Sequence, residues 1–405
     1  MSGKTGTFSL RGDFFAFSEI KVVLISLAHG VNDMYAAFLP TFVPYIKASL
    51  GLDYALTGAL SLIVGLCHIV GQPVIGYFCD RIRRPWLMII GPLLCGLGAV
   101  MLPSAGSYGG ALLFAGLWGV GSALFHPQGS GGIGYVARPE KLSFALTLFN
   151  ISGTAGVLVS PVVAVFVVER FGYGGLWATL LPPLLLAPLI YCSMPFLREA
   201  LPSRTEGGSG FWRSFGGVFA VLFPVWAVAV IRDVVFQCVR FFLPLKIAAE
   251  GGSLDAIGTV LFCITLGGTL TMLPVERLAR RVSIRTILGL TLLLGSLFLT
   301  SASLASGLLS TSLYVVGVSC IYSTIPLTVV LAQTLMPHAR SVASSVVMGL
   351  AWGTANVALY PLGQLADRIG IHDTTLILGL LPLLGLLFLL SPVFRGRAED
   401  CEKIA

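Results

Sequence analysis

The chain has 405 residues, of which 56% are hydrophobic and 11% charged, and its formal net charge is +7. Soluble domains carry about 25% charged residues, so this composition excludes a soluble globular protein. HExxH, GxSxG and phosphate-loop patterns are missing, and the eight cysteines show no CxxC spacing. We therefore expect no enzyme, no cofactor and no metal site.

Apolar stretches of membrane-spanning length follow one another along the whole chain. A spanning helix needs about 20 mostly apolar residues. Roughly twelve such stretches are centred near residues 33, 66, 96, 120, 155, 184, 230, 264, 293, 320, 353 and 383. We predict an all-α integral membrane protein with twelve transmembrane helices.

The basic residues set the expected orientation. With the N-terminus inside and the helices alternating, 19 Lys and Arg residues face the cytoplasm and 4 face outward. This asymmetry follows the positive-inside rule and accounts for the net charge without a nucleic-acid partner. We expect a multi-pass protein of the bacterial inner membrane with both termini in the cytoplasm.

The first stretch carries a polar stripe. His29, Asn32 and Asp33 are spaced i, i+3 and i+4 and so share one helix face. A charge near the bilayer centre costs about 2.5–3.5 kcal/mol, which favours a functional interpretation. Asp33 is our candidate proton carrier, because an antiporter needs a carboxylate for which proton and substrate compete. His29, one turn earlier, would tune the site or relay the proton.

The segment GYFCDRIRRPW, residues 76–86, joins the second and third stretches. It resembles the signature loop of the major facilitator superfamily, Gly-x-x-x-Asp-Arg-x-Gly-Arg-Arg, although Arg83 replaces a glycine. A degenerate copy, MLPVERLARR, follows the eighth stretch, and GQLADRIG follows the eleventh. The residues that match are Gly76, Asp80, Arg81 and Arg84 in the first copy, and Glu276, Arg277, Arg280 and Arg281 in the second.

The resemblance implies that this loop braces the two halves of the molecule on the cytoplasmic side. We expect Asp80 to pair with the start of the eleventh helix and Arg340, and Glu276 to pair with Arg138 or Lys141. The alternative is an ordinary basic loop with incidental ion pairs.

The fourth stretch ends in His126, Pro127 and Gln128. His126 and Gln128 are candidates for substrate binding, although a histidine beside a proline can equally satisfy the freed backbone of a helix end.

One apolar phrase occurs twice, 200 residues apart. GTAGVLVSP (153–161) lies in the fifth stretch and GTANVALYP (353–361) in the eleventh. The only long polar segment, 197–216, lies between them. We therefore predict two pseudo-symmetric six-helix halves, 1–196 and 217–405, joined by a cytoplasmic linker at 197–216. The first copy partly resembles the superfamily's antiporter motif. Residues expected to pack helices closely are Gly153, Gly156, Pro161, Gly353 and Pro361.

The seventh stretch contains Arg232, Asp233, Gln237 and Arg240. The arginines are candidates for holding an anionic group, because a guanidinium offers a planar fork. Asp233 and Arg240 either contribute to this site or neutralise each other as a structural pair. Asn32 on the first helix and Tyr322 on the tenth complete the expected substrate-binding set.

A closer resemblance extends along the whole chain, to the fosmidomycin-resistance group of the superfamily. It is carried by HGVNDM (29–34), GQPVIGYFCD (71–80), GVGSALFHPQGS (119–130) and QTLMP (333–337). The resemblance implies proton-driven export of small drugs.

The function expected from the sequence is secondary active transport by alternating access, with proton-coupled export of a small drug-like or anionic compound. The alternative is a proton-coupled importer of an organic anion. A membrane enzyme and a channel are disfavoured, since catalytic motifs are missing and a channel needs no brace between halves. Expected partners are a small-molecule substrate, protons and the lipid bilayer, with the protein itself a monomer.

Overall fold

The computed structural model describes residues 18–72, 74–75, 84–138, 141–194, 211–279, 281–336 and 343–394, and every regular element in these ranges is helical. The first half contains α2 (Ser18–Asp33), α3 (Phe38–Leu50), α4 (Tyr54–Leu66), the π-helix η1 (Cys67–Gly71), α6 (Trp86–Met101), the 3₁₀ turn η2 (Leu102–Ser104), α7 (Tyr108–Val136), α8 (Leu142–Phe171), η4 (Tyr173–Leu180) and α9 (Leu181–Ser193).

The second half follows the same plan. It contains α10 (Phe211–Ala249), α11 (Leu254–Ala279), α12 (Ile284–Leu304), α13 (Gly307–Tyr322), α14 (Ile325–Leu335), the π-helix η5 (Ser345–Leu350), α16 (Ala351–Ile369), α17 (Ile371–Leu380), α18 (Pro382–Phe388) and η6 (Pro392–Phe394). Together the described residues form twelve helical spans long and apolar enough to cross a membrane, which confirms the predicted fold class.

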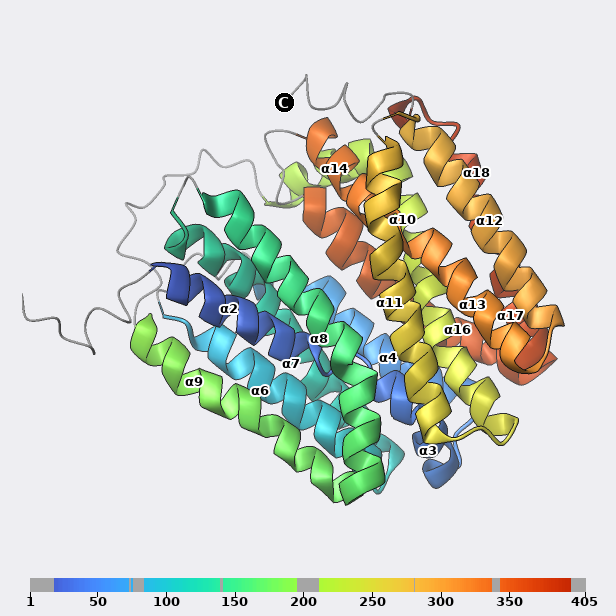
Figure 1. The fold of residues 1–405 in the computed structure, drawn as a ribbon, viewed down its shortest axis with the longest axis horizontal. Helices are drawn as coiled ribbons and strands as arrows, with labels where there is room; N and C mark the ends of the chain where they lie inside the picture. The colour runs from blue at the N-terminus through green and yellow to red at the C-terminus, as the bar shows by residue number, and fades with distance from the viewer. Residues whose placement is uncertain are drawn as a thin grey trace, which may run out of the picture.

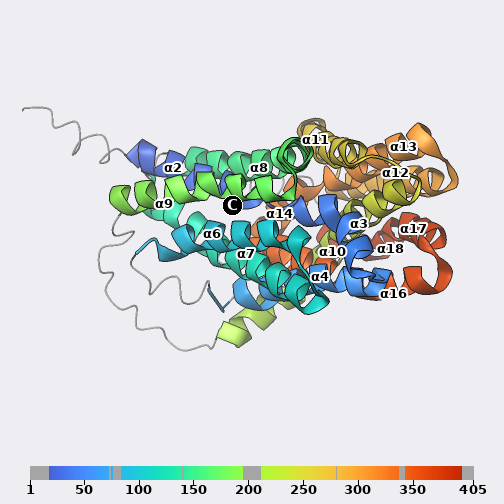
Figure 2. The same ribbon diagram turned by 90° about the horizontal axis from the view of Figure 1, so that it is seen from below.

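The two halves lie side by side and meet most closely at one end. Figures 1 and 2 show α8 beside α11 where the halves touch, and toward the start of α2 and the end of α14 the halves draw apart. The closely packed end is the one that holds the turn between α3 and α4. Among the described residues, the helices of the two halves are therefore packed together at this end, the closed end, and lie further apart at the other.

A helix cap contributes to this closed end. The carboxylate of Asp367, at the end of α16, accepts hydrogen bonds of 2.9 Å from the backbone nitrogens of both Tyr54 and Ala55 at the start of α4. A negative charge is favourable at a helix N-terminus, where backbone N–H groups lack partners. Asp367 thus ties the second half to the first through the GQLADRIG segment.

Small residues let the same two helices approach. A Cβ at Gly58 would meet the backbone of Leu359, and a Cβ at Gly65 would meet the backbone of Gly353. The glycine that opens the second copy of the repeated phrase therefore packs between the halves.

Several spans are interrupted near their middle. The first span breaks at residues 34–37 between α2 and α3, and the tenth breaks between α13 and α14. The second and eleventh spans contain the π-helices η1 and η5. Interrupted helices leave backbone groups free at membrane depth and occur in transporters where they line a site.

Candidate functional site

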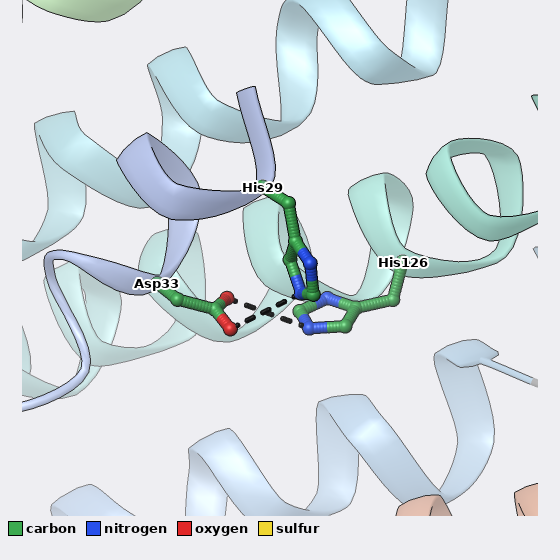
Figure 3. A group of neighbouring side chains, drawn as sticks. All are labelled: His29, Asp33 and His126. Carbon is green, nitrogen blue, oxygen red and sulfur yellow. Dashed lines mark ion pairs between the residues drawn. The ribbon is translucent and has the colours of Figure 1, made fainter. Parts of the chain in front are cut away.

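Asp33 lies at the last residue of α2, directly before the break in the first span. His29 Nε2 is 3.2 Å from Asp33 Oδ2, and His126 Nε2 of α7 is 3.5 Å from Asp33 Oδ1. Asn32 Nδ2 donates to Asp33 Oδ1 at 3.1 Å. Figure 3 shows both imidazole rings converging on the one carboxylate. We call His29, Asp33 and His126 the carboxylate–histidine cluster.

Backbone carbonyls fix the tautomers of both histidines. His29 Nδ1 is 2.7 Å from the carbonyl oxygen of Phe149, and His126 Nδ1 is 2.9 Å from that of Ser122. A carbonyl can only accept, so each Nδ1 carries a proton and donates it. In a neutral imidazole the Nε2 atom would then present a lone pair to the carboxylate. A proton on each Nε2 makes both contacts to Asp33 favourable, so the cluster has places for up to two protons at these atoms.

Aromatic side chains hold the ring of His29. It stacks on Phe149 with centroids 3.9 Å apart and on Phe125 at 5.7 Å. Aromatic faces attract cations, which suits an imidazolium. A Cβ at Gly153 of α8 would lie 2.7 Å from both ring nitrogens, so only glycine leaves room for the ring there. The first copy of the repeated phrase, 153–161, thus packs directly against the cluster through Gly153.

Exposure increases across the cluster toward the interface between the halves. The side chain of His29 is 8% exposed, that of Asp33 18% and that of His126 32%. The ring of His126 lies 6.3 Å from that of His68 in η1, which in turn lies 4.6 Å from Trp352 in α16. His126 is therefore the most exposed member of the cluster, and through His68 it is the one linked by ring contacts to Trp352 of the second half.

The same atoms could hold a divalent cation. The donor atoms of the three residues lie within 4.8 Å of one another, and among the described residues this is the group of metal-ligand type that meets such a distance. Protons on the two Nε2 atoms satisfy the same geometry without a metal.

The second half contains a buried ion pair that differs from the expected one. Arg232 Nε donates to Asp233 Oδ1 at 2.7 Å, and Arg232 Nη2 donates to Asp233 Oδ2 at 3.2 Å. Arg232 also donates to Thr328 Oγ1 at 2.8 Å. The expected alternative, a pair between Asp233 and Arg240, is wrong, because these residues lie two helical turns apart and Gln237 lies between them.

Arg240 occupies a different environment on the same helix. It donates to Gln237 Oε1 at 3.4 Å and to the carbonyl of Ala36 at 3.3 Å, and it lies 5.1 Å above the ring of Phe236. Gln237 also donates to Asn356 Oδ1 at 2.8 Å. The ring of Phe236 stacks on Tyr322 at 4.0 Å, which places Tyr322 near this arginine.

Gln128 does not join the carboxylate–histidine cluster. Its Oε1 accepts from the backbone nitrogen of Met88 at 2.9 Å, and its Nε2 donates to the carbonyl of Arg84 at 3.0 Å. Both ends of the amide are thus used at the start of α6. The expectation that Gln128 binds substrate is corrected to a capping role between two helices.

The expected cytoplasmic latch falls largely outside the described residues. Those outside are Gly76, Asp80, Arg81, Arg340 and the side chain of Glu276. Arg84 and Arg277 are described and exposed. Arg138 and Lys141, expected beside Glu276, approach Glu19 of their own half at 3.8 and 3.1 Å. This difference fits a structure whose halves are apart at that end.

Two contributors were not expected from the sequence. Phe149 supplies both a stacking face and a carbonyl to His29, and Ser160 Oγ accepts the backbone N–H of Ala37 at 2.9 Å. Ser160 thereby satisfies a donor freed by the break in the first span. Its position in the repeated phrase, where the superfamily motif has glycine, was the available signal.

The remaining residues expected to pack helices lie within helices. Gly156 packs against the backbone of Gly30, and Pro161 and Pro361 lie inside α8 and α16.

Residues 25–357 match the family model of the Major Facilitator Superfamily. The chain belongs to this superfamily. It is a multi-pass membrane transporter, which carries small-molecule substrates by alternating access and is not an enzyme.

Curated relatives cover nearly the whole transporter. It is 28% identical over 384 residues to the fosmidomycin resistance protein of Escherichia coli, covering 91% of each chain. It is 24% identical over 380 residues to the uncharacterized transporter YfnC of Bacillus subtilis, covering 92% of each. A stretch of 168 residues, 40% of this chain, is 27% identical to human solute carrier family 67 member A1.

Solved structures share the fold. A bacterial homologue of the human lysosomal transporter Spinster, inward-facing and unoccupied, has a TM-score of 0.78 at 14% identity over 93% of this chain and 97% of its own. The xylose transporter XylE of E. coli, in an inward-open conformation, has a TM-score of 0.72 at 14% identity over 96% of this chain and 100% of its own.

Proposed function

We propose that this transporter exports a small anionic or drug-like compound in exchange for protons across a bacterial inner membrane. Both termini then lie in the cytoplasm, and the closed end of the structure faces outward. The protein works as two six-helix halves, 1–196 and 217–405, which move about the linker at 197–216.

The carboxylate–histidine cluster is the observation that carries the proposal. It places one carboxylate and two imidazole Nε2 atoms in contact at membrane depth, with the other nitrogen of each ring already bonded to a carbonyl. Protons on the two Nε2 atoms make these contacts favourable, and groups of this kind inside a membrane mark proton relays. Asp33 is the proposed proton carrier, and His29 and His126 share its protons.

Two further observations support an anionic cargo and its export. Arg240 is a buried cation whose bonds go to neutral oxygens, and it contacts the turn that follows Asp33. The relative from E. coli is named for resistance to fosmidomycin, which a transporter confers when it removes the drug from the cell.

The test uses purified protein in liposomes that enclose a pH-sensitive dye, with equal pH on both sides and the membrane potential clamped. Fosmidomycin added outside should raise the internal pH as it enters and protons leave. A fall in internal pH would contradict exchange and indicate import together with protons. Protein-free liposomes report passive leakage.

A further inference from the structure

The two buried arginines of α10 are in opposite electrostatic states. Arg232 is 2% exposed and makes a two-point ion pair with Asp233, so its charge is compensated. Arg240 is 5% exposed, and within the described residues no carboxylate lies within 4.0 Å of it. Burying an ion without a counterion costs desolvation free energy. A buried arginine without a carboxylate partner is therefore expected where an anion binds.

The hydrogen-bonding capacity of Arg240 is also unfilled. A guanidinium has five N–H donors. Arg240 makes two long bonds, of 3.4 Å to Gln237 and 3.3 Å to Ala36, and its buried Nε has no partner. The unused donors are those that a bidentate carboxylate or phosphonate accepts.

The surroundings of Arg240 suit an oxyanion attached to a flat body. The guanidinium lies above Phe236, whose ring stacks on Tyr322. Tyr322 is partly exposed and ends α13 at the break in the tenth span. Together these rings present an aromatic surface beside a buried positive charge.

We propose that Arg240 is the anion-binding residue of the cargo site, that Arg232 has no part in binding, and that an organic carboxylate or phosphonate displaces the bond between Arg240 and Ala36. The identity of the cargo site rests on the proposed function, but the assignment to one arginine and the displaced bond go beyond it.

The displaced bond gives the anion a mechanical effect. Arg240 belongs to the second half, whereas Ala36 belongs to the first half and lies in the turn after Asp33. This bond therefore joins the halves. An anion that accepts hydrogen bonds from the guanidinium in place of Ala36 releases the turn. Binding then loosens this contact between the halves near the middle of the first span and alters the backbone next to the carboxylate–histidine cluster.

Binding to detergent-purified protein tests the assignment without a membrane or a proton gradient. Calorimetric titrations with benzoate, phenylphosphonate and neutral benzamide compare the wild type with Arg240→Lys, Arg240→Gln and the control Arg170→Gln, since Arg170 is exposed in the last turn of α8. We expect at least one of the two anions to bind the wild type and the control equally, and benzamide to bind neither. Whichever anion binds identifies the oxyanion that the site accepts.

Arg240→Gln should weaken that binding by roughly 30-fold or more, as expected when one partner of a buried charge pair is lost. Arg240→Lys should fall between, because it keeps the charge but loses the fork. Equal binding by Arg240→Gln, equal binding of benzamide, or no binding of either anion to the wild type would each overturn the proposal.

Thermal unfolding separates binding from a structural role. Removing an uncompensated buried cation relieves its desolvation, so Arg240→Gln should unfold at or above the wild-type temperature and lose the stabilisation by the anion. A lower unfolding temperature with retained stabilisation by the anion would show that Arg240 is structural. Proton exchange can fail in liposomes while Arg240-dependent binding persists, so the two proposals fail separately.

Discussion

Asp33 combines two properties that a coupling residue needs. It is close enough to two imidazoles to share their protons, and its 18% exposure leaves it reachable from the space between the halves. An amide in its place would keep the shape and lose the charge.

Asp33→Asn should abolish substrate flux driven by a pH gradient while leaving exchange of labelled for unlabelled substrate, because exchange needs no net proton movement. The matched control is Asp373→Asn, since Asp373 forms an exposed pair with His372 at 2.9 Å. Gradient-driven flux at the wild-type rate in Asp33→Asn would remove Asp33 from the mechanism.

Gly153 should tolerate no side chain, because a Cβ there would collide with the ring of His29. Gly153→Ala is expected to destabilise the protein by about 1–3 kcal/mol and to reduce coupled transport strongly. Gly134→Ala on α7 is the control, since a Cβ at Gly134 meets no atom within 4 Å. Thermal unfolding and transport would be measured for both, and equal behaviour would show that the packing of His29 is unimportant.

Helical periodicity could predict one part of the site and not another. His29 and Asp33 are one turn apart, so their contact followed from spacing alone. The pair between Arg232 and Asp233 did not, because neighbouring residues on a helix point about 100° apart and meet only when a long arginine side chain turns back. His126 comes from another helix, and its contact with Asp33 depends on how α7 packs against α2.

The closed end depends on elements capping one another across the halves. Asp367 of α16 fills the N-terminus of α4, whereas Asp53 caps the same helix locally through the nitrogen of Leu56 at 2.6 Å. The two bonds of Asp367 should break during transport, whereas the bond between Asp53 and Leu56 should persist.

Asp367→Asn should weaken the closed end, since a neutral amide cannot accept both N–H groups as a carboxylate does; a cap of this kind contributes about 0.5–2 kcal/mol. A cysteine placed at the buried position Leu359 should then react faster with a thiol reagent from outside. Asp53→Asn should leave the rate unchanged, because asparagine caps a helix as well as aspartate. Equal rates in all three proteins would contradict the role of Asp367.

The sequence predicted the elements better than their interruptions. Twelve apolar stretches and a repeated phrase were sufficient for the fold, because spanning helices need length and hydrophobicity. The break at residues 34–37 was not predicted, since it depends on Ser160 of another helix accepting the N–H of Ala37. The repeated phrase has different neighbours in its two copies: Gly153 packs on His29, whereas Gly353 packs between the halves. This difference was not predicted from the repeat.

At the scale of the whole molecule, alternating access requires the two halves to close against each other first at one end and then at the other. The structure is closed at the end held by Asp367 and more open where α2 begins, as Figure 1 shows. With an even number of spans, α2 begins and α18 ends on the same side of the membrane. We expect that side to be the cytoplasm.

A green fluorescent protein fused after Ala405 should fluoresce, because it folds in the cytoplasm but not after export in unfolded form. Alkaline phosphatase inserted after Gly370, in the exposed turn between α16 and α17 at the closed end, should be active because it folds only outside. An inactive phosphatase together with a non-fluorescent fusion would contradict the proposed orientation and indicate the opposite one.

Proton release on substrate binding is the most direct test of the central claim. Fosmidomycin would be added to detergent-purified protein in lightly buffered solution, and the pH followed. The wild type should release one or two protons per molecule, since the cluster has places for two, and Asp33→Asn should release fewer while still binding the compound. Saturated binding to the wild type without proton release would contradict exchange at Asp33.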